Sequence, residues 1–431
     1  MRIEQTERQR IIRLIKQQVV PAIGCTEPVC VALCVARAVE ELGAKPANVQ
    51  VLLSANILKN AMGVGIPGTG MVGLPIAVAL GALIGKSAYG LEVLKDVTPE
   101  DVEKGKAFIA ENRIDIKLKE NIIEKLYVEV CATTENGHKA VAVISGKHTQ
   151  FTYIESDGNV KLDEGASAAE GQSAELVELT LRKVYDFAVS SPIEELEFIL
   201  EARRLNENAS KQALKGCYGH ELGKTLSRPL GRGIMGDNIF SHILSGTSAA
   251  CDARMAGAMI PVMSNSGSGN QGICATMPVV VFAEENHNTE EELVRALILS
   301  HLTAIYIKQS LGVLSALCGC VVASTGSSCG ITYLMGGKYD QVSFAVKNMI
   351  ANLTGMICDG AKPSCALKLT SGVSTAVLSA MLAMQQKCVS SVEGIIEDDV
   401  DKSIRNLTSI GAEAMNETDK KVLEIMTHKC F

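Results

Sequence analysis

Tryptophan is absent from this sequence of 431 residues, aromatic residues make up only 4% of it, and no run of basic residues occurs. The hydrophobic share of 47% therefore comes mainly from aliphatic side chains, which occur together with 38 glycines. Small and aliphatic residues suit an interior of closely packed helices. The missing basic clusters and the net charge of −7 argue against nucleic acid as a partner, because phosphate binding requires clustered Lys and Arg.

The first residues also lack the apolar core and cleavage site of a secretion signal, since charged residues begin at Arg2. Two uncharged segments, 255–283 and 309–337, have the length of a membrane span, but Gly, Ser, Asn and Pro interrupt them. We expect buried helices joined by polar loops there, in a soluble cytoplasmic protein that does not contact a membrane. In that compartment the 14 cysteines are reduced, and serve as structural thiols, metal ligands or reactive groups.

The length exceeds what one hydrophobic core usually serves, so the sequence predicts two domains. Apolar residues recur at helical spacing near the start of the chain and again from residue 166 onward. Between them, four segments alternate as strands do, at 114–119, 125–134, 139–145 and 149–154. The prediction is an α+β fold, in which a mainly α-helical catalytic domain (1–46 and 165–431) carries an inserted smaller α/β domain (47–164).

A cysteine directly precedes the second predicted helix, which extends over 27–42. Thr26 is a suitable N-cap for this helix, so Cys25 lies beside its positive end. That position lowers the pKa of a thiol and favours the nucleophilic or basic thiolate. The alternative is a small buried thiol, like Cys30 and Cys34 one and two turns further on.

Uncharged polar residues gather in segment 264–274, Ser-Asn-Ser-Gly-Ser-Gly-Asn-Gln-Gly-Ile-Cys, between two apolar stretches. Buried polar groups need partners, so the loop either satisfies its own hydrogen bonds or holds a small polar ligand such as an amino acid, which we favour. The glycine-rich run 63–70 matches GxGxxG by letter without the strand context of a dinucleotide site, and is either a carboxylate cradle or a connector. On polarity, the predicted substrate-binding residues are Asn56, Asn60, Ser266, Ser268, Asn270 and Gln271.

Five cysteines fall between residues 309 and 368, but no Cys-x2-Cys zinc knuckle occurs among them. Cys318 and Cys320 stand at the end of an expected long helix, and Cys329 falls in an expected Gly/Ser loop. Cys358 and Cys365 come from a turn and a helix start, a suitable pair of thiolates for an iron–sulfur cluster. Buried structural thiols are the alternative.

Five separated motifs are distinctive. They read Gly-Cys-Thr-Glu-Pro at 24–28, Lys-Asn-Ala-Met-Gly-Val-Gly-Ile-Pro-Gly-Thr at 59–69, Ser-Gly-Ser-Gly-Asn-Gln-Gly at 266–272, Leu-Cys-Gly-Cys-Val-Val-Ala-Ser at 317–324, and Met-Ile-Cys-Asp-Gly-Ala-Lys-Pro-Ser-Cys-Ala-Leu-Lys at 356–368. Together they resemble the L-cysteine desulfidase family, which is related to the alpha chain of bacterial iron–sulfur L-serine dehydratases. The resemblance implies an oxygen-sensitive [4Fe–4S] cluster, no pyridoxal phosphate, and β-elimination from a small L-amino acid.

By the same resemblance, Cys318, Cys358 and Cys365 hold the cluster and Cys25 is the active-site thiol. Cys320 stands two residues from Cys318 and is the alternative first ligand. An iron without a protein ligand could act as a Lewis acid toward the leaving group, while Cys25 removes the Cα proton. The expected products from L-cysteine are pyruvate, ammonia and sulfide.

Other functions stay open at this point. The same scaffold could eliminate water from L-serine, or a non-catalytic iron–sulfur redox sensor could keep the three ligands without needing Cys25. A zinc hydrolase would need more acidic or His ligands than Asp359, and a pyridoxal-phosphate lyase would need a lysine such as Lys362 and a phosphate cup. Cys329 and Cys430 are given no role. An apolar helical chain of this kind is prone to form homo-oligomers.

Overall fold

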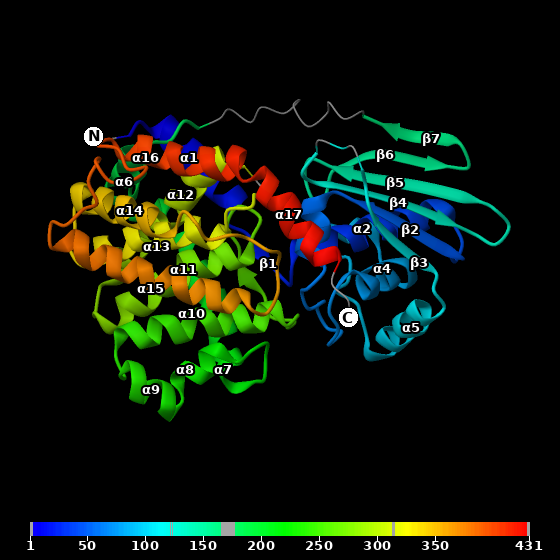
Figure 1. Ribbon diagram of the computed structural model, residues 1–431, viewed down its shortest axis with the longest axis horizontal. Helices are drawn as coiled ribbons and strands as arrows, with labels where there is room; N and C mark the ends of the chain where they lie inside the picture. Colours follow the sequence, from blue (N-terminus) through cyan, green and yellow to red (C-terminus); the bar gives the residue numbers. More distant parts are fainter. Residues whose placement is uncertain (1–2, 121, 123, 165–176, 313–314, 429–431) are drawn as a thin grey trace.

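The computed structural model describes residues 3–120, 122, 124–164, 177–312 and 315–428. Within them the chain forms a helical body and a smaller α/β unit side by side (Figure 1). The C-terminal helix α17 (Asn416–Thr427) lies where the two meet, and its Leu423 belongs to the core of the α/β unit. The predicted α+β class, mainly helical with a smaller α/β part, is confirmed.

The helical body is arranged around α13 (Gly319–Leu334). This helix contacts its neighbours α11 (Gly269–Glu285), α12 (Glu290–Leu311), α14 (Tyr339–Leu353) and α15 (Cys365–Met384). The other α-helices that surround them are α1 (Gln5–Gln18), α6 (Leu181–Ser190), α7 (Leu200–Lys215), α8 (Leu222–Ser227), α9 (Pro229–Met235), α10 (Ile239–Met255) and α16 (Val400–Ser409).

Small side chains let these helices pack closely. At Gly326 of α13, a Cβ would lie 2.2 Å from the carbonyl oxygen of Ser300 on α12, so no larger residue fits. The buried hydroxyls of α13 bond to carbonyls of the preceding turn, as when Thr325 Oγ1 donates to the Val321 carbonyl at 2.8 Å. The core is therefore filled by close backbone approach rather than by aromatic rings, in keeping with the composition.

The α/β unit contains a six-stranded sheet in the order β3-β2-β4-β5-β6-β7. All neighbouring strands are antiparallel except β2 and β3, which are parallel. α2 packs on β4 and β5 and against α4, so these two helices lie over one face of the sheet (Figure 1). The elements are α2 (Thr26–Leu42), β2 (Asn48–Leu53), α3 (Ala55–Ala61), α4 (Leu74–Leu83), α5 (Pro99–Ala110), β3 (Ile114–Leu118), β4 (Tyr127–Thr133), β5 (Lys139–Ser145), β6 (Phe151–Ser156) and β7 (Asn159–Asp163).

Three local expectations are wrong. Segment 309–337 does not contain a Gly/Ser loop around Cys329, which is buried inside α13. The helical spacing of apolar residues also predicts a helix at 193–205, but this stretch begins with two 3₁₀ turns and α7 begins only at Leu200. Strand β7 was not expected, because this edge strand is mostly exposed and lacks the alternation of a half-buried strand.

The domain boundaries at 46 and 165 stay predictions. α2 ends before the first of them, yet its buried residues belong to the core of the α/β unit. The second boundary lies outside the described residues. Packing therefore joins α2 to the sheet, although it precedes the first predicted boundary.

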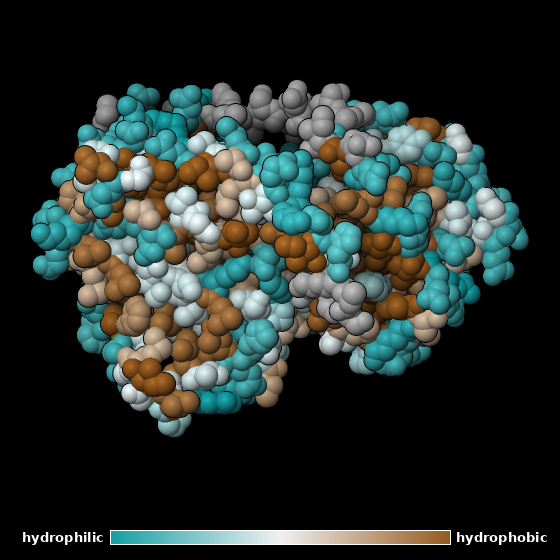
Figure 2. All heavy atoms as spheres, viewed as in Figure 1, coloured by the Kyte–Doolittle hydropathy of each residue, from teal (hydrophilic) through white to brown (hydrophobic). Residues whose placement is uncertain are grey.

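One helix of the described chain, α15, is long and apolar enough to cross a membrane by length and composition. Of its most apolar window, 56% is buried inside the protein, where α15 packs on α10, α13 and α14. Its outer face exposes four apolar side chains, and Figure 2 shows apolar side chains among polar ones over the helical body. They are Leu367, Leu378, Met381 and Leu382.

Candidate active site

Four helices begin at one cavity of about 100 Å³, which is lined by residues of both the helical body and the α/β unit. Cys25, Ser268 and Cys318 are the N-cap residues of α2, α11 and α13, and Cys365 is the first residue of α15. Each of these four residues lines the cavity. Because a helix N-terminus carries partial positive charge, this convergence favours thiolates and other anions.

A second compartment of about 100 Å³ continues from the first. Glu27, Asn60, Ser268, Gln271 and Cys358 line both, and we call the two together the thiol cavity. The second compartment adds side chains of the polar loop, of the α/β unit and of α12, namely Ser266, His148 and Lys308.

Cys25 is positioned by a short two-stranded ladder, in which β1 (Pro21–Ala22) pairs with β8 (Val262–Met263). The turn between β1 and α2 requires glycine, since Gly24 has φ +68° and a Cβ there would lie 2.2 Å from Pro67 Cγ. The α2 helix begins at Thr26 with Cys25 as its N-cap, so the expected Thr26 cap is wrong.

Cys318 and Cys358 come together through a single antiparallel bridge between Leu317 and Ile357. The Cys318 amide donates to the Met356 carbonyl at 3.0 Å, and the Cys358 amide donates to the Ala316 carbonyl at 2.7 Å. Cys318 thus opens α13 instead of ending α12. The bridge holds two thiols, 40 positions apart in the sequence, at the same wall of the cavity.

The loop that carries Cys358 and Cys365 is held by charged side chains. Asp359 pairs with Lys362 at 2.6 Å and also with Lys368. Burial alone would raise the pKa of Asp359, but the hydrogen bonds from both lysines lower it to about 2. The carboxylate therefore stays ionised and fixes the loop on the first turns of α15.

The thiols suit an iron–sulfur cluster better than a single metal ion. Among the described residues, no group of three or more His, Cys, Asp or Glu side chains converges as a single ion requires. Ligands of one ion share a centre, at about 2.3 Å for zinc and sulfur. A [4Fe–4S] cluster has a separate iron for each thiolate, and Cys318, Cys358 and Cys365 all line the same cavity. The donor set is therefore compatible with a cluster.

Cys25 is paired with a carboxylate. Its Sγ donates a hydrogen bond to Glu27 Oε2 at 2.9 Å, and Asn60 Nδ2 donates to Glu27 Oε1 at 3.1 Å. Burial, and then the neighbouring Glu27, raise the pKa of the Cys25 thiol well above its usual range. The expectation of a lowered pKa is wrong in this state, because the helix N-terminus does not outweigh burial.

The predicted substrate-binding residues divide into two groups. Asn56 is buried on α3, its Oδ1 has no hydrogen-bond partner in the described part of the chain, and it does not line the thiol cavity. The other five do line it, Ser266 only in the second compartment and Asn270 only in the first. Those five are Asn60, Ser266, Ser268, Asn270 and Gln271. The structure thus brings together residues that are more than 200 positions apart in the sequence.

A buried histidine supports the polar loop from behind. Asn265 Nδ2 lies 3.1 Å from His301 Nδ1, and Thr276 Oγ1 lies 3.0 Å from His301 Nε2. Burial lowers the pKa of His301 to about 3, so the ring is neutral at neutral pH. His301 is therefore a hydrogen-bonding support and not a cavity residue.

Sequence reasoning missed the cations of the cavity. Arg254 and Lys368 line the first compartment and Lys308 lines the second. Burial lowers the pKa of Lys308 to about 8. Arg254 and Lys308 are the basic residues in the last turns of α10 and α12. A cation next to a long uncharged stretch of a helix is the signal that could have revealed Lys308, because burying a charge is costly.

Comparison with known proteins agrees with this geometry. A family model of the serine dehydratase alpha chain matches residues 88–424. A UPF0597 protein of Bacteroides thetaiotaomicron is 72% identical over 425 residues, 99% of each chain. A UPF0597 protein of Bacteroides fragilis is 69% identical over 425 residues, also 99% of each chain. A UPF0597 protein of Porphyromonas gingivalis is 54% identical over 433 residues, 99% of this chain and 100% of the relative.

The fold, the thiol cavity and these matches define the class, a serine-dehydratase-like family of lyases associated with iron–sulfur clusters. The chain belongs to the serine dehydratase alpha chain family, and its full-length relatives are UPF0597 proteins. The relationship expected from the five motifs is confirmed. The family match contains the three proposed cluster cysteines but begins after Cys25. Cys430 lies outside the described residues.

Proposed function

We propose that this protein is an iron–sulfur-dependent lyase that acts on L-cysteine and releases pyruvate, ammonia and sulfide. The observation that carries the proposal is the convergence of Cys318, Cys358 and Cys365 on the cavity that also contains Cys25 and Glu27. Neighbouring thiols and burial raise the pKa values of these three thiols, so they keep their protons until a metal replaces them.

A [4Fe–4S] cluster held by Cys318, Cys358 and Cys365 would supply Lewis-acid assistance to the departing β-substituent. The protein contributes the enclosure. The Leu317–Ile357 bridge and the Asp359 ion pairs fix the ligand loops from two sides. We do not assign pyridoxal phosphate a part, and Lys362 is engaged by the Asp359 carbonyl at 2.7 Å and by the Asp359 carboxylate.

Cys25 is proposed as the base that removes the Cα proton of the substrate. Its own proton must leave first, and Glu27 Oε2 at 2.9 Å is the acceptor. The Cα–H bond then breaks, its electrons form the Cα=Cβ bond, and the Cβ–S bond breaks to release sulfide. The resulting aminoacrylate takes up water and yields pyruvate and ammonia. A thiolate generated beside the substrate is a strong base, because burial raises its pKa.

The polar residues are proposed to orient the amino acid. Gln271 presents a buried Oε1 without a hydrogen-bond partner among the described groups, which suits a substrate ammonium group. Asn60 holds Glu27 in position through the 3.1 Å hydrogen bond. Ser266, Ser268 and Asn270 extend this polar wall along the start of α11.

L-Serine is the second candidate substrate, and the match to the serine dehydratase alpha chain favours it. Its hydroxyl would occupy the place of the cysteine sulfur, and water would leave in place of sulfide. A redox sensor is the alternative of another class. The Cys25–Glu27 pair argues against it, since a sensor does not require a base beside the cluster.

The test is anaerobic purification with iron and acid-labile sulfide analysis, followed by pyruvate assays with L-cysteine and L-serine on one sample. We expect about four irons per chain and pyruvate from L-cysteine. Pyruvate from L-serine alone would make the protein a dehydratase. A full cluster without either activity would favour the sensor, and no cluster after anaerobic reconstitution would refute the proposal.

A cytoplasmic location also stays a proposal. All cysteines of the described chain are free, as expected in a reducing compartment. Exposure to air would oxidise such thiols and endanger the cluster. Fractionation of cells with an antibody to the protein would test the location, and recovery from an oxidising compartment would contradict it.

A further inference from the structure

Arg254, one of the cations that line the thiol cavity, has no ion-pair partner among the described residues. Arg254 is 3% exposed, and its Nη1 donates to Asn270 Oδ1 at 3.0 Å. Its Nε is buried and has no hydrogen-bond partner among the described groups. Burying a guanidinium without a neighbouring carboxylate costs free energy, and an anion that binds in the cavity would offset this cost.

The neighbouring helix makes room for this guanidinium. A Cβ at Gly269 would lie only 2.2 Å from Arg254 Nε, so the side chain rests directly on the first residue of α11. Ser268 caps this helix by accepting the Gln271 amide, and both residues line the cavity. The amides and the positive end of α11 therefore add to the field of Arg254 at one place.

The chemistry of the partner follows from the arrangement. A guanidinium offers two parallel N–H donors, which match the two oxygens of a carboxylate. The cavity of about 100 Å³ admits a small molecule only. Both Cys25 and Arg254 line this cavity, and the positive charge of Arg254 acts on the Cys25 thiol.

We propose that Arg254, supported by Asn270 and the first turn of α11, binds the α-carboxylate of the amino-acid substrate. This inference rests on the proposed lyase function and adds to it the residue that selects α-amino acids over simple thiols. With the carboxylate at Arg254 and the ammonium near Glu27 and Gln271, the Cα proton faces Cys25 and the side chain extends toward the three cluster cysteines.

The competing explanation is that Arg254 only balances the charge of the thiolates. The binding of two small thiols that are fragments of L-cysteine distinguishes these two explanations. 3-Mercaptopropionate has the thiol and the carboxylate of L-cysteine but no amine, whereas cysteamine has the thiol and the amine but no carboxylate. If Arg254 binds the carboxylate, its replacement weakens the binding of 3-mercaptopropionate alone. If Arg254 is only a counter-ion, its replacement weakens the binding of both compounds and lowers the iron content.

The experiment measures binding of both compounds by anaerobic calorimetry to the cluster-containing wild type, Arg254→Gln and Arg254→Lys. Arg203→Gln is the matched control, because Arg203 pairs with Glu207 and Glu284 away from the cavity. We expect Arg254→Gln to weaken the binding of 3-mercaptopropionate by about 10- to 100-fold, as for the loss of other charged hydrogen bonds. The affinity for cysteamine should stay within about threefold of the wild-type value. Arg254→Lys keeps part of the affinity, and iron content is unchanged.

The KM for L-cysteine should rise by the same factor as the loss of 3-mercaptopropionate affinity. Gly269→Ala is a second variant, which keeps the arginine but places a methyl group against Nε, and it should weaken the same compound selectively. Equal losses for both compounds, loss of iron, or no effect on 3-mercaptopropionate would overturn the inference. So would failure of the wild type to bind 3-mercaptopropionate.

The calorimetry also separates this inference from the lyase proposal. If the wild type forms no pyruvate but binds 3-mercaptopropionate, and Arg254→Gln loses this binding, the carboxylate site is supported and the lyase function is refuted. If the wild type forms pyruvate and Arg254→Gln keeps its KM, the carboxylate site alone falls.

Discussion

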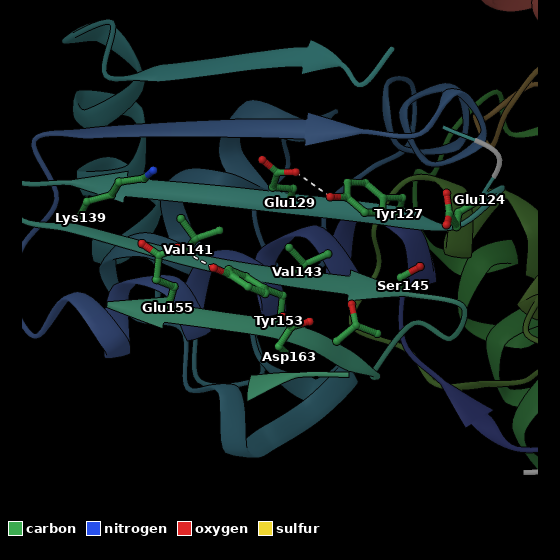
Figure 3. A pocket seen from close by; sticks show the side chains of 11 residues that line it. Glu124, Tyr127, Glu129, Lys139, Val141, Val143, Ser145, Tyr153, Glu155 and Asp163 are labelled. Atoms are coloured by element: carbon green, nitrogen blue, oxygen red, sulfur yellow. Dashed lines mark hydrogen bonds between the residues drawn. The ribbon is translucent and has the colours of Figure 1, made fainter. Parts of the chain in front are cut away.

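Two hollows of this molecule differ in volume and in how far the polar groups that line them are hydrogen-bonded to each other. The larger, about 440 Å³, lies on the outer face of the sheet (Figure 3). Two pairs of its polar groups are hydrogen-bonded to each other, as Tyr127 Oη donates to Glu129 at 2.6 Å and Tyr153 Oη donates to Glu155 at 2.7 Å. The first compartment of the thiol cavity is only about 100 Å³, yet two of its lining residues have buried atoms without a hydrogen-bond partner among the described residues, namely Arg254 Nε and Gln271 Oε1.

The thiol cavity is therefore distinguished by buried polar atoms without hydrogen-bond partners among the described residues, and not by its volume. A surface hollow whose hydroxyls and carboxylates satisfy one another gains little from a ligand, because the ligand must replace existing hydrogen bonds. Buried donors and acceptors without partners gain a full hydrogen bond when a ligand arrives. We therefore expect substitutions in the thiol cavity to act on chemistry and equivalent substitutions on the sheet to have little effect.

The largest effect should come from the proposed cluster ligands. Cys358→Ser or Cys365→Ser should remove iron and lower kcat/KM by about 1000-fold or more, since metal assistance is worth several kcal/mol. Cys329→Ser is the control, because Cys329 is a buried thiol inside α13 that does not line the thiol cavity. Iron analysis and pyruvate assays on the three variants measure the difference. Iron loss from Cys329→Ser alone would contradict the assignment.

The same assay decides between Cys318 and Cys320. Both line the cavity, with their sulfurs 3.4 Å apart, and Cys320 Sγ also lies 3.1 Å from Met356 Sδ. We expect Cys318→Ser to lose iron and Cys320→Ser to retain it. The reverse result would move the first ligand to Cys320 while leaving the cluster in place.

The next largest effect should follow removal of the proposed base. Cys25→Ala should lower kcat by about 10²- to 10⁴-fold, the usual contribution of a general base, while the iron content stays at the wild-type value. Cys30→Ala is the matched control one turn further along α2, where the thiol is buried in the other core. Full turnover by Cys25→Ala on an intact cluster would remove Cys25 from the mechanism.

Sequence reasoning was strongest where function depends on residue identity. The five motifs contain the thiols and the polar loop, and the fold brings them to one cavity. Sequence reasoning was weaker for properties that depend on how the helices pack, such as burial and the pKa of a side chain. The pKa of Cys25 follows its burial, which the sequence does not state, and Arg254 and Lys308 belong to no periodic pattern that would place them at the cavity. Asn56 has the right polarity but does not line the cavity, whereas Asn60, one turn further along the same helix α3, does.

A smaller effect, on stability, should trace to the histidine behind the cavity. The pKa of His301 is lowered by burial to about 3, so the folded state excludes a proton that the unfolded chain takes up below about pH 6.5. Stability is therefore fully present above that pH and is lost as pH falls toward 3, by about 2 kcal/mol between pH 6.5 and 5. Denaturant unfolding of wild type and His301→Gln at pH 7 and 5 measures this. Identical pH slopes for both proteins would contradict it.

The smallest effect should be found on the sheet. Tyr153→Phe removes one hydrogen bond at the surface and Glu155→Gln weakens it by removing the charge, where such a bond contributes about 1 kcal/mol or less to stability. Both variants should keep their iron and should turn over L-cysteine within about twofold of wild type, since no group of the sheet hollow lines the thiol cavity. Pyruvate assays beside Cys25→Ala provide the comparison. A tenfold loss from either variant would mean that the larger hollow takes part in function, and that paired polar groups are no sign of an idle surface in this fold.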